Sequence, residues 1–343
     1  MRRRGTVLAA LALVCVWPAI VLSCSSGAPP TQFQALAPPV SRIPASPLAP
    51  SPTPPSLPPP TPPPLSPFTG LPTDLGEPVL CVKIDNAVEA RPQSGLELAD
   101  LVYVELVEGG LSRLLAVYQS RVPSVVGPVR STRVSDVQLL ANFGRPALAF
   151  SGAAPVVGAL VSRAPVLDVS ALARPGDYYR DRRRPMPPNL YGDAKALRQG
   201  GLPPRDIGVR VGPPPPGGRP VPGTEVRYPA TTIEVQWVPA EAQWVISMDG
   251  APLTSASGPR PRAATVVLQR VPVRDTSVRD AAGSPSPFAA TVGAGDAVVL
   301  RDGLAFTGHW SRPAPDAITT FTLPDGSPLA FAPGSIWVVL VPA

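Results

Sequence analysis

The sequence predicts an α+β protein, in which a mixed α/β N-terminal domain is followed by a β-rich C-terminal domain, behind a signal peptide and a proline-rich linker. The first thirty residues combine three arginines with a short apolar run. Residues 28–67 contain 17 prolines in 40 residues. Beyond Phe68, helical and strand patterns alternate, and then short strands separated by turns follow, as expected for two domains of different class.

The N-terminal segment has the organisation of a lipoprotein signal peptide. Arginines at 2–4 precede the apolar run 7–22, and small residues follow. The run closes on Val-Leu-Ser-Cys at 21–24, which is similar to the lipobox of bacterial lipoproteins. An uncleaved membrane anchor is the alternative, but 16 residues interrupted by Pro18 fall short of the ~20 that a spanning helix needs. We therefore expect residues 1–23 to be removed and Cys24 to anchor an extracytoplasmic protein to the membrane.

Charge and cysteine content restrict the function classes. The formal net charge is +6, but loss of the three N-terminal arginines leaves 27 basic and 24 acidic residues. No Lys/Arg run with interleaved aromatic residues follows, so nucleic acid is not an expected partner. After Cys15 and Cys24, only Cys81 remains. The exported domains therefore depend on an apolar core without a disulfide, and Cys81 is interpreted as a buried thiol rather than a nucleophile.

Residues 24–67 are predicted to form the lipidated cysteine and a disordered linker. Proline cannot donate a backbone hydrogen bond and favours polyproline II. At ~3.1 Å per residue, the 40 residues would extend on the order of 120 Å. A spacer that reaches into a cell wall and a stalk of no set length are the two alternatives.

The first domain, residues 68–212, is expected to mix strands with helices. Strands are predicted at 78–84, 100–108, 111–120 and 146–150, with Gly109-Gly110 turning the second into the third. Ser135 with Gln138 three residues later resembles a capping box that opens a helix through about Phe143. Further helices are predicted at 156–163 and 193–199.

A Pro/Gly stretch at 213–223 is predicted to link this domain to the second, residues 224–343. Strands are predicted at 233–238, 243–248, 264–273, 297–301, 304–309, 319–323, 328–331 and 336–341. Asp302-Gly303 and Pro324-Asp325-Gly326 supply turns. About eight strands at this spacing predict a sandwich or a partly open barrel.

Several long motifs carry a family resemblance. They are FTGLP (68–72), KIDN (83–86), RPQSGLELAD (91–100), VEGGLSRLLAVYQS (107–120), GPVRSTR (127–133), NLY (189–191), TGHWSR (307–312) and PGSIWVVLVP (333–342). Together they resemble the YerB-like bacterial lipoproteins, with the N- and C-terminal domains of unknown function 3048. The resemblance implies an exported two-domain lipoprotein, with no known reaction. The family usually has histidine where this chain has Pro188, so a general base at that position would be absent here.

Arg130 and Arg133 are the central candidates for a binding site. They lie just ahead of the predicted helix, where hydroxyls and free backbone N–H groups would help them to hold a carboxylate or phosphate. In a cell envelope, such an anion belongs to a peptide stem, a teichoic acid or a lipid head group. The expected polar wall and rim of this site are Arg113, Asp85, Asn86, Glu105, Glu108, Asn189 and Tyr191. The alternative is that both arginines form structural ion pairs with Asp85, Glu105 or Glu108.

Other chemistries have weaker support. Carboxylates among Asp85, Asp100, Glu105 and Glu108 would suit a hydrolase of cell-wall polymer, but residues three apart in a regular strand point to opposite faces. The segment 178–184 is either a solvated loop or a rim of arginine and tyrosine. His309 is the only histidine, so neither a transition-metal site nor a Ser-His-Asp triad is expected.

These observations together predict a non-catalytic binding or assembly factor of the cell envelope, with an arginine-lined cleft in its first domain. No cofactor is expected. The expected partners are the membrane, through the N-terminal lipid, and a cell-wall polymer or an envelope protein.

Overall fold

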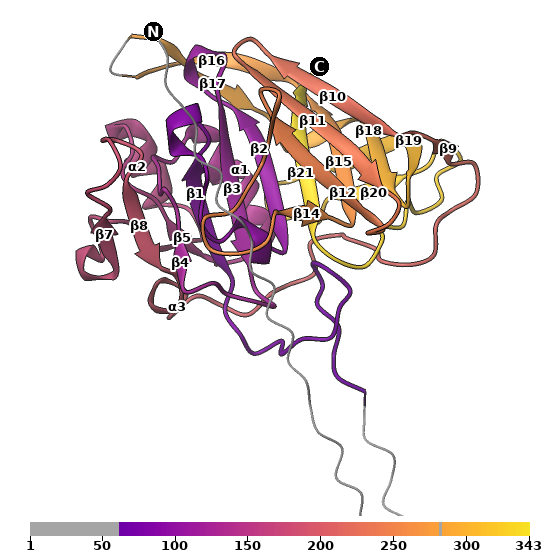
Figure 1. Ribbon diagram of the computed structural model, residues 1–343, viewed down its shortest axis with the longest axis horizontal. Coiled ribbons are helices and arrows are strands. Elements are labelled where there is room, and N and C mark those ends of the chain that lie inside the picture. The colour runs from indigo at the N-terminus through magenta and orange to yellow at the C-terminus, as the bar shows by residue number, and fades with distance from the viewer. Residues whose placement is uncertain (1–61, 281–282) are drawn as a thin grey trace, which may run out of the picture. The chain divides into compact units, whose positions relative to one another are not determined.

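An eleven-stranded mixed sheet runs through both halves of the chain (Figure 1). The computed structural model describes residues 62–280 and 283–343, so the predicted signal peptide, Cys24 and nearly all of the linker lie outside the described residues. The strands of this sheet are β1 (Leu80–Asp85), β2 (Leu101–Leu106), β3 (Ser112–Tyr118), β5 (Ala147–Ala149), β6 (Leu167–Asp168), β9 (Arg219–Pro220), β15 (Thr265–Val271), β18 (Gly293–Arg301), β19 (Leu304–Arg312), β20 (Thr320–Thr322) and β21 (Ile336–Pro342). Their order is β20-β19-β18-β15-β21-β2-β3-β1-β5-β6, and β9 pairs with β19.

Strand β21 joins the two halves. It pairs in parallel with β15 on one side and with β2 on the other, so that Ile336 lies opposite both Thr265 and Leu101. Its first five residues, Ile-Trp-Val-Val-Leu, are all buried. Parallel strands that are covered on both faces have such unbroken apolar runs.

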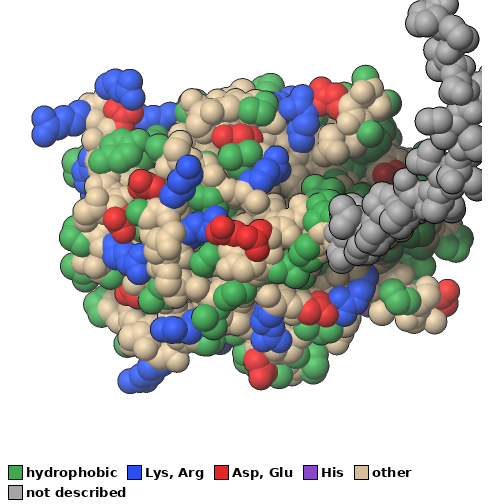
Figure 2. Space-filling model, turned by 90° about the horizontal axis from the view of Figure 1, so that it is seen from below, with side chains coloured by type: hydrophobic (Ala, Val, Ile, Leu, Met, Phe, Trp, Pro, Cys, Tyr) green, Lys and Arg blue, Asp and Glu red, His purple; other side chains and the backbone are tan. Residues whose placement is uncertain are grey.

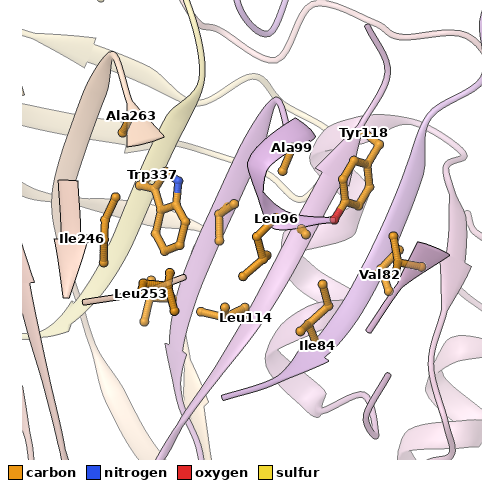
Figure 3. Close-up of a cluster of buried hydrophobic side chains, with 14 of the residues drawn as sticks. Val82, Ile84, Leu96, Ala99, Leu114, Tyr118, Ile246, Leu253, Ala263 and Trp337 are labelled. Carbon is orange, nitrogen blue, oxygen red and sulfur yellow. The ribbon is translucent and has the colours of Figure 1, made fainter. Parts of the chain in front are cut away.

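A five-stranded sheet packs on one face of the large sheet. Its strands are β10 (Gly223–Tyr228), β11 (Thr231–Val238), β12 (Gln243–Met248), β13 (Ala251–Pro252) and β14 (Arg262–Ala263). Tyr228 Oη donates to the carbonyls of Val104 at 3.2 Å and Leu340 at 2.7 Å. Trp337 of β21 lies between Ile246 of the small sheet and the strands of the first half (Figure 3). The second half therefore does not form a sandwich or barrel of its own, because β15 and β18–β21 belong to the shared sheet.

The other face of the large sheet carries a second apolar cluster, which includes Leu139, Phe143 and Val157. The helices are α1 (Val134–Leu140), α2 (Pro155–Val161) and α3 (Ala194–Leu197), with 3-10 turns at Val88–Ala90, Leu96–Leu98, Glu108–Gly110, Ala141–Phe143 and Pro175–Asp177. The remaining strands are β4 (Val125–Val126), β7 (Tyr178–Arg180), β8 (Leu190–Asp193), β16 (Val273–Arg279) and β17 (Pro285–Ala289). Among the described residues, no helix has the length and apolarity to cross a membrane.

The predicted turns are confirmed. Asp302 and Gly303 have φ of 52° and 74° and connect β18 to β19 with Arg301 opposite Leu304, which is the geometry of a two-residue hairpin. Gly109 and Gly110, with φ of 68° and 74°, connect β2 to β3. These positive φ angles are available to glycine at little cost.

Three element predictions are wrong in detail. The strand predicted at 264–273 is broken at Pro272 into β15 and β16, since proline has no N–H for the sheet. The segment 328–331 forms isolated bridges only. The capping box is Arg133 with Asp136, whose carboxylate accepts from the Arg133 N–H at 2.6 Å. Ser135 Oγ instead accepts from the N–H of Ala289, the last residue of β17, and Gln138 Oε1 accepts from the N–H of Thr291, which follows β17.

Candidate functional site

The segment that carries Arg130 and Arg133 is fixed to the large sheet on both sides. The Arg130 N–H donates to the Lys83 carbonyl of β1 at 2.8 Å, and the Arg130 carbonyl accepts from the Ser151 N–H, after β5, at 3.0 Å. Thr132 N–H donates to the Gly152 carbonyl at 3.0 Å. The arginine segment is therefore held between β1 and the residues that follow β5. With only seven residues, and with its first turn occupied by Asp136, α1 adds no binding site of its own.

A cleft of about 650 Å³ opens over this segment. Arg130 and Arg133 line it together with Arg113, which comes from β3. The remaining wall consists of Glu108, Leu111, Ser131, Thr132, Gly152, Ala153, Ala154, Val157, Val278, Arg279 and Asp280. Three of the predicted arginines and Glu108 therefore meet in one hollow.

Two carboxylates pair with these arginines. Asp85 lies opposite Arg113 in the register of β1 and β3, and its oxygens lie 3.3 Å from Arg113 Nε and 2.9 Å from Arg130 Nε. Glu108 lies 2.7 Å from Arg133 Nε and accepts a second bond from Arg133 Nη2 at 2.8 Å. Burial alone would raise the pKa of Glu108, but the hydrogen bonds and charge of Arg133 lower it. Both arginines therefore form the ion pairs of the alternative considered from the sequence, Arg130 with Asp85 and Arg133 with Glu108.

Arg113 has a guanidinium nitrogen that its ion pair with Asp85 does not use. Its side chain is 9% exposed, and Nη1 is buried without a hydrogen-bond partner among the described residues. Burial lowers the pKa of this guanidinium to about 10, Asp85 opposes that effect, and the charges of Arg133 and Arg130 add to it. A buried donor without a partner costs about 1–3 kcal/mol, and more when it is charged. An anion at Nη1 would remove that cost.

A buried charge cluster lies behind the arginine segment. Lys83 Nζ is 2.9 Å from Glu105 and 2.7 Å from Asp136, and all three side chains are 0–1% exposed. Burial, with the nearby charge of Asp136, raises the pKa of Glu105 to about 8. Asp136 also accepts from Thr132 Oγ1 at 2.9 Å. The cluster therefore holds the arginine segment in place, and Glu105 is not among the residues that line the cleft.

The other predicted wall residues lie elsewhere. Asn86 is buried, donates to Ser112 Oγ at 2.7 Å and accepts from Gln93 at 3.0 Å. Asn189 is also buried and accepts from Arg180 at 2.7 Å. Tyr191 stacks on Tyr179, with ring centroids 5.8 Å apart, beside a separate hollow of about 410 Å³. None of the three lines the arginine cleft.

A second hollow, of about 290 Å³, adjoins the cleft and was not predicted from the sequence. Leu111, Arg113 and Arg130 line both spaces. Its other walls are Asp85, Ala87, Glu89, Ser112 and Pro185–Pro188. The signal for it in the sequence is the run Pro-Met-Pro-Pro at 185–188, because proline stiffens the chain and Met186 adds an apolar side chain.

The carboxylates considered for hydrolysis all have structural partners. Asp100 accepts the backbone N–H groups of Gln119 and Ser120 at 2.6 and 2.8 Å, and also bonds the Ser120 hydroxyl. Asp85, Glu105 and Glu108 are paired with cations, as described above. Cys81 is buried in the core, and burial raises the pKa of its thiol. His309 contacts Asp296 at 3.1 Å on the half-exposed surface of β19.

The described residues contain no group of three or more His, Cys, Asp or Glu side chains arranged to hold a metal ion. On the face shown in Figure 2, Lys and Arg side chains lie beside Asp and Glu side chains rather than in one basic field. Positive charge is therefore dispersed on that face.

Comparisons with known proteins agree with this architecture. Residues 68–205 match the model of the N-terminal domain of a family described as "Protein of unknown function (DUF3048)", and residues 224–338 match its C-terminal domain. The chain is 48% identical over 64 residues to "Putative lipoprotein YerB" of Bacillus subtilis (strain 168), a stretch that covers 19% of each protein. The crystal structure of YerB from Bacillus subtilis superimposes with a TM-score of 0.67 at 25% identity, over 81% of this chain and 97% of that one. The chain thus belongs to the DUF3048 family, with both of the family's domains and a YerB-like fold.

Proposed function

We propose that this protein is an exported, lipid-anchored protein of the cell envelope that binds an anionic ligand or partner through the arginine cleft, without catalysis. The observation that carries the proposal is that Arg113, Arg130 and Arg133 line one open cleft, and that Nη1 of Arg113 is a buried donor without a partner among the described residues. The lipobox-like ending at Cys24 and the name of the Bacillus relative support the anchor.

Binding is tested with Arg130→Gln in the mature chain, residues 24–343 carrying Cys24→Ser. The Arg130 side chain is 28% exposed, and Asp85 still forms its ion pair with Arg113 when Arg130 is replaced. We expect co-sedimentation with purified cell-wall sacculi to weaken at least tenfold, because charge-assisted hydrogen bonds contribute about 1.5–3 kcal/mol. The melting temperature should fall by less than about 4 °C.

Arg227→Gln on β10, with a 70% exposed side chain, is the matched control and should bind as the wild type does. High salt should weaken wild-type binding, since the arginine cleft is open to solvent. A large loss of stability with unchanged binding would instead assign Arg130 to a structural ion pair. Release of soluble wall fragments would favour the alternative function, a carboxylate-dependent hydrolase.

The anchor is tested by detergent phase partition of the full chain. The wild type should enter the detergent phase, and Cys24→Ser should not, because one thioether-linked diacylglycerol supplies two apolar chains. Equal partition of the two proteins would contradict lipidation at Cys24.

A further inference from the structure

A buried amine, that of Lys83, is held between two buried carboxyl groups. Nζ lies 2.7 Å from Asp136 Oδ1 and 2.9 Å from Glu105 Oε1, and all three side chains are 0–1% exposed. They come from three elements, Lys83 from β1, Glu105 from β2 and Asp136 from the first turn of α1. An amine and a carboxyl group that are held in contact away from water are the two reactants of amide formation.

The amine differs chemically from nearly all other cations of this protein. Lys83 and Lys195 are the only lysines among 30 Lys and Arg residues, and Lys195 is exposed. A guanidinium does not lose its proton in proteins, whereas an amine can do so when burial disfavours its charged form. A neutral amine is a nucleophile. Position 83 therefore carries the one type of basic side chain that can attack a carboxyl carbon.

Asp136 is held as the electrophile of such a reaction would be. Its Oδ2 accepts the Arg133 N–H at 2.6 Å and the Thr132 hydroxyl at 2.9 Å, whereas Oδ1 faces Lys83. Two fixed donors on one oxygen stabilise the negative charge that develops there when a nucleophile adds to the carbon. Glu105 Oε1 lies against Lys83 without a donor of this kind among the described residues. The carboxyl group activated for attack is therefore that of Asp136.

Glu105 is placed to move the protons that amide formation requires. Burial raises the pKa of Glu105 to about 8, so its carboxyl group carries a proton at neutral pH. Burial opposes ionisation of Asp136, but the charge and hydrogen bond of Lys83 lower its pKa, so Asp136 starts as the carboxylate of an ion pair. The carboxyl groups of Glu105 and Asp136 also hydrogen-bond each other. Glu105 therefore contacts both reactants, as an acid–base group has to.

We propose that Lys83 and Asp136 condense to an intramolecular amide, which joins β1 covalently to the start of α1. One proton first passes from the ammonium to Asp136 Oδ1, which leaves both groups neutral, as a buried site favours. Nζ then bonds to Cγ while Oδ2 takes the developing charge. Glu105 removes a second proton from Nζ and gives its own to Oδ1. The Cγ–Oδ1 bond breaks and Oδ1 leaves as water, so that Oδ2 becomes the amide oxygen and Glu105 ends protonated, as it began.

The amide removes a buried ion pair and closes a long loop. The two linked residues are 53 positions apart in sequence. Cys81 is the one cysteine among the described residues, so no disulfide constrains that part of the chain. A covalent link of this span restricts the unfolded chain as a disulfide does. The link is independent of what the arginine cleft binds, so either proposal can fail while the other stands.

The test is the intact mass of the mature chain, residues 24–343 carrying Cys24→Ser, which is folded, purified and then denatured for mass spectrometry. We expect a mass that is lower than the sequence mass by one water molecule. A tryptic digest should contain a branched peptide that joins the segment of Lys83 to the segment of Asp136. A folded wild-type chain with the full sequence mass would overturn the inference, and so would a water loss that leaves the segment of Asp136 unlinked.

Variants that fold, as judged by circular dichroism, assign the roles. Lys83→Arg should keep the full mass, whereas Lys195→Arg, the matched control at the exposed lysine, should lose water as the wild type does. Glu105→Gln should also keep the full mass, because acid–base catalysis contributes about a hundredfold or more to the rate. Asp136→Asn should lose one ammonia molecule in place of water, since the side-chain nitrogen then leaves. A water loss that persists in Lys83→Arg or in Asp136→Asn would overturn the inference.

Discussion

At the scale of single residues, the charges of this protein form two layers. Glu108 lines the cleft, Asp85 lines the adjoining hollow, and both are held by arginines, whereas Lys83, Glu105 and Asp136 are fully buried. One lysine between two buried carboxylates leaves one negative charge in excess. A shared proton removes that charge, which agrees with the raised pKa of Glu105.

This cluster predicts a pH-dependent stability. The folded-state pKa of Glu105, about 8, lies above its ordinary value of 4.5, so the protonated form is favoured by folding. The contribution of Glu105 to the free energy of unfolding is therefore fully present below about pH 4.5. It is lost as the pH rises toward 8, by up to ~1.4 kcal/mol per pH unit. In Glu105→Gln, a neutral amide replaces the acid, and the free energy of unfolding should depend less on pH in this window.

Urea unfolding at pH 5, 6.5 and 8 measures the effect. Glu225→Gln, at a half-exposed position of β10, is the matched control and should keep the wild-type slope. A Glu105→Gln protein that keeps the wild-type pH slope between pH 5 and 8 would contradict the raised pKa of Glu105.

The structure brings four of the predicted site residues together, from the turn after β2, from β3 and from the segment before α1, whereas burial separates Glu105 from them. Arg113, Arg130, Arg133 and Glu108 do share one cleft. Glu105 is nearly adjacent to Glu108 in sequence, yet it points into the interior, and no local pattern states which face of β2 is covered. Its salt bridge with Lys83 depends on β1 and β2 each pairing with β3.

At the scale of elements, neighbouring residues predict turns and strand breaks, whereas they do not predict which distant strands pair. The Asp302-Gly303 turn is set by two residues and was predicted correctly. The predicted capping box was wrong because Thr132, Ser135, Asp136 and Gln138 all carry side-chain acceptors near this helix start. Asp136 takes the role while it also pairs with the buried Lys83. The break at Pro272 follows from its missing N–H and could have been inferred.

Strand β21 supplies an element-scale prediction. Trp337 is 1% exposed and packs in the cluster that contains residues of β2, β3 and the small sheet. Trp337→Ala should lower the free energy of unfolding by about 3–5 kcal/mol, through lost burial and an unfilled cavity. Because β21 pairs with both halves, far-UV circular dichroism and tryptophan fluorescence should still report one shared urea transition.

Val88→Ala, at a 66% exposed position, is the control and should change stability by less than about 0.5 kcal/mol. Two separate transitions, of which Trp337→Ala moves only one, would show that the halves unfold independently.

At the scale of the whole molecule, the α+β prediction describes the secondary structure of each half, but it does not include the sheet that the two halves share. Alternating patterns in the first half and regular strands in the second gave the mixed, strand-rich character correctly. The Pro/Gly stretch before Gly223 suggested two bodies, yet the large sheet crosses from one half to the other. Hydrophobic periodicity indicates that a strand is buried and says nothing about which distant strand lies beside it.

The central place of β21 has a consequence for the order in which the chain is made. Ribosomes deliver β2 and β15 long before residues 336–342, which are the last strand among the described residues. Until β21 arrives, both neighbours present a row of unpaired backbone N–H and C=O groups toward the gap that it fills. Such open edges pair readily with other chains. The first half therefore carries an exposed edge at β2 until residues 336–342 have been made, so the large sheet cannot be completed half by half.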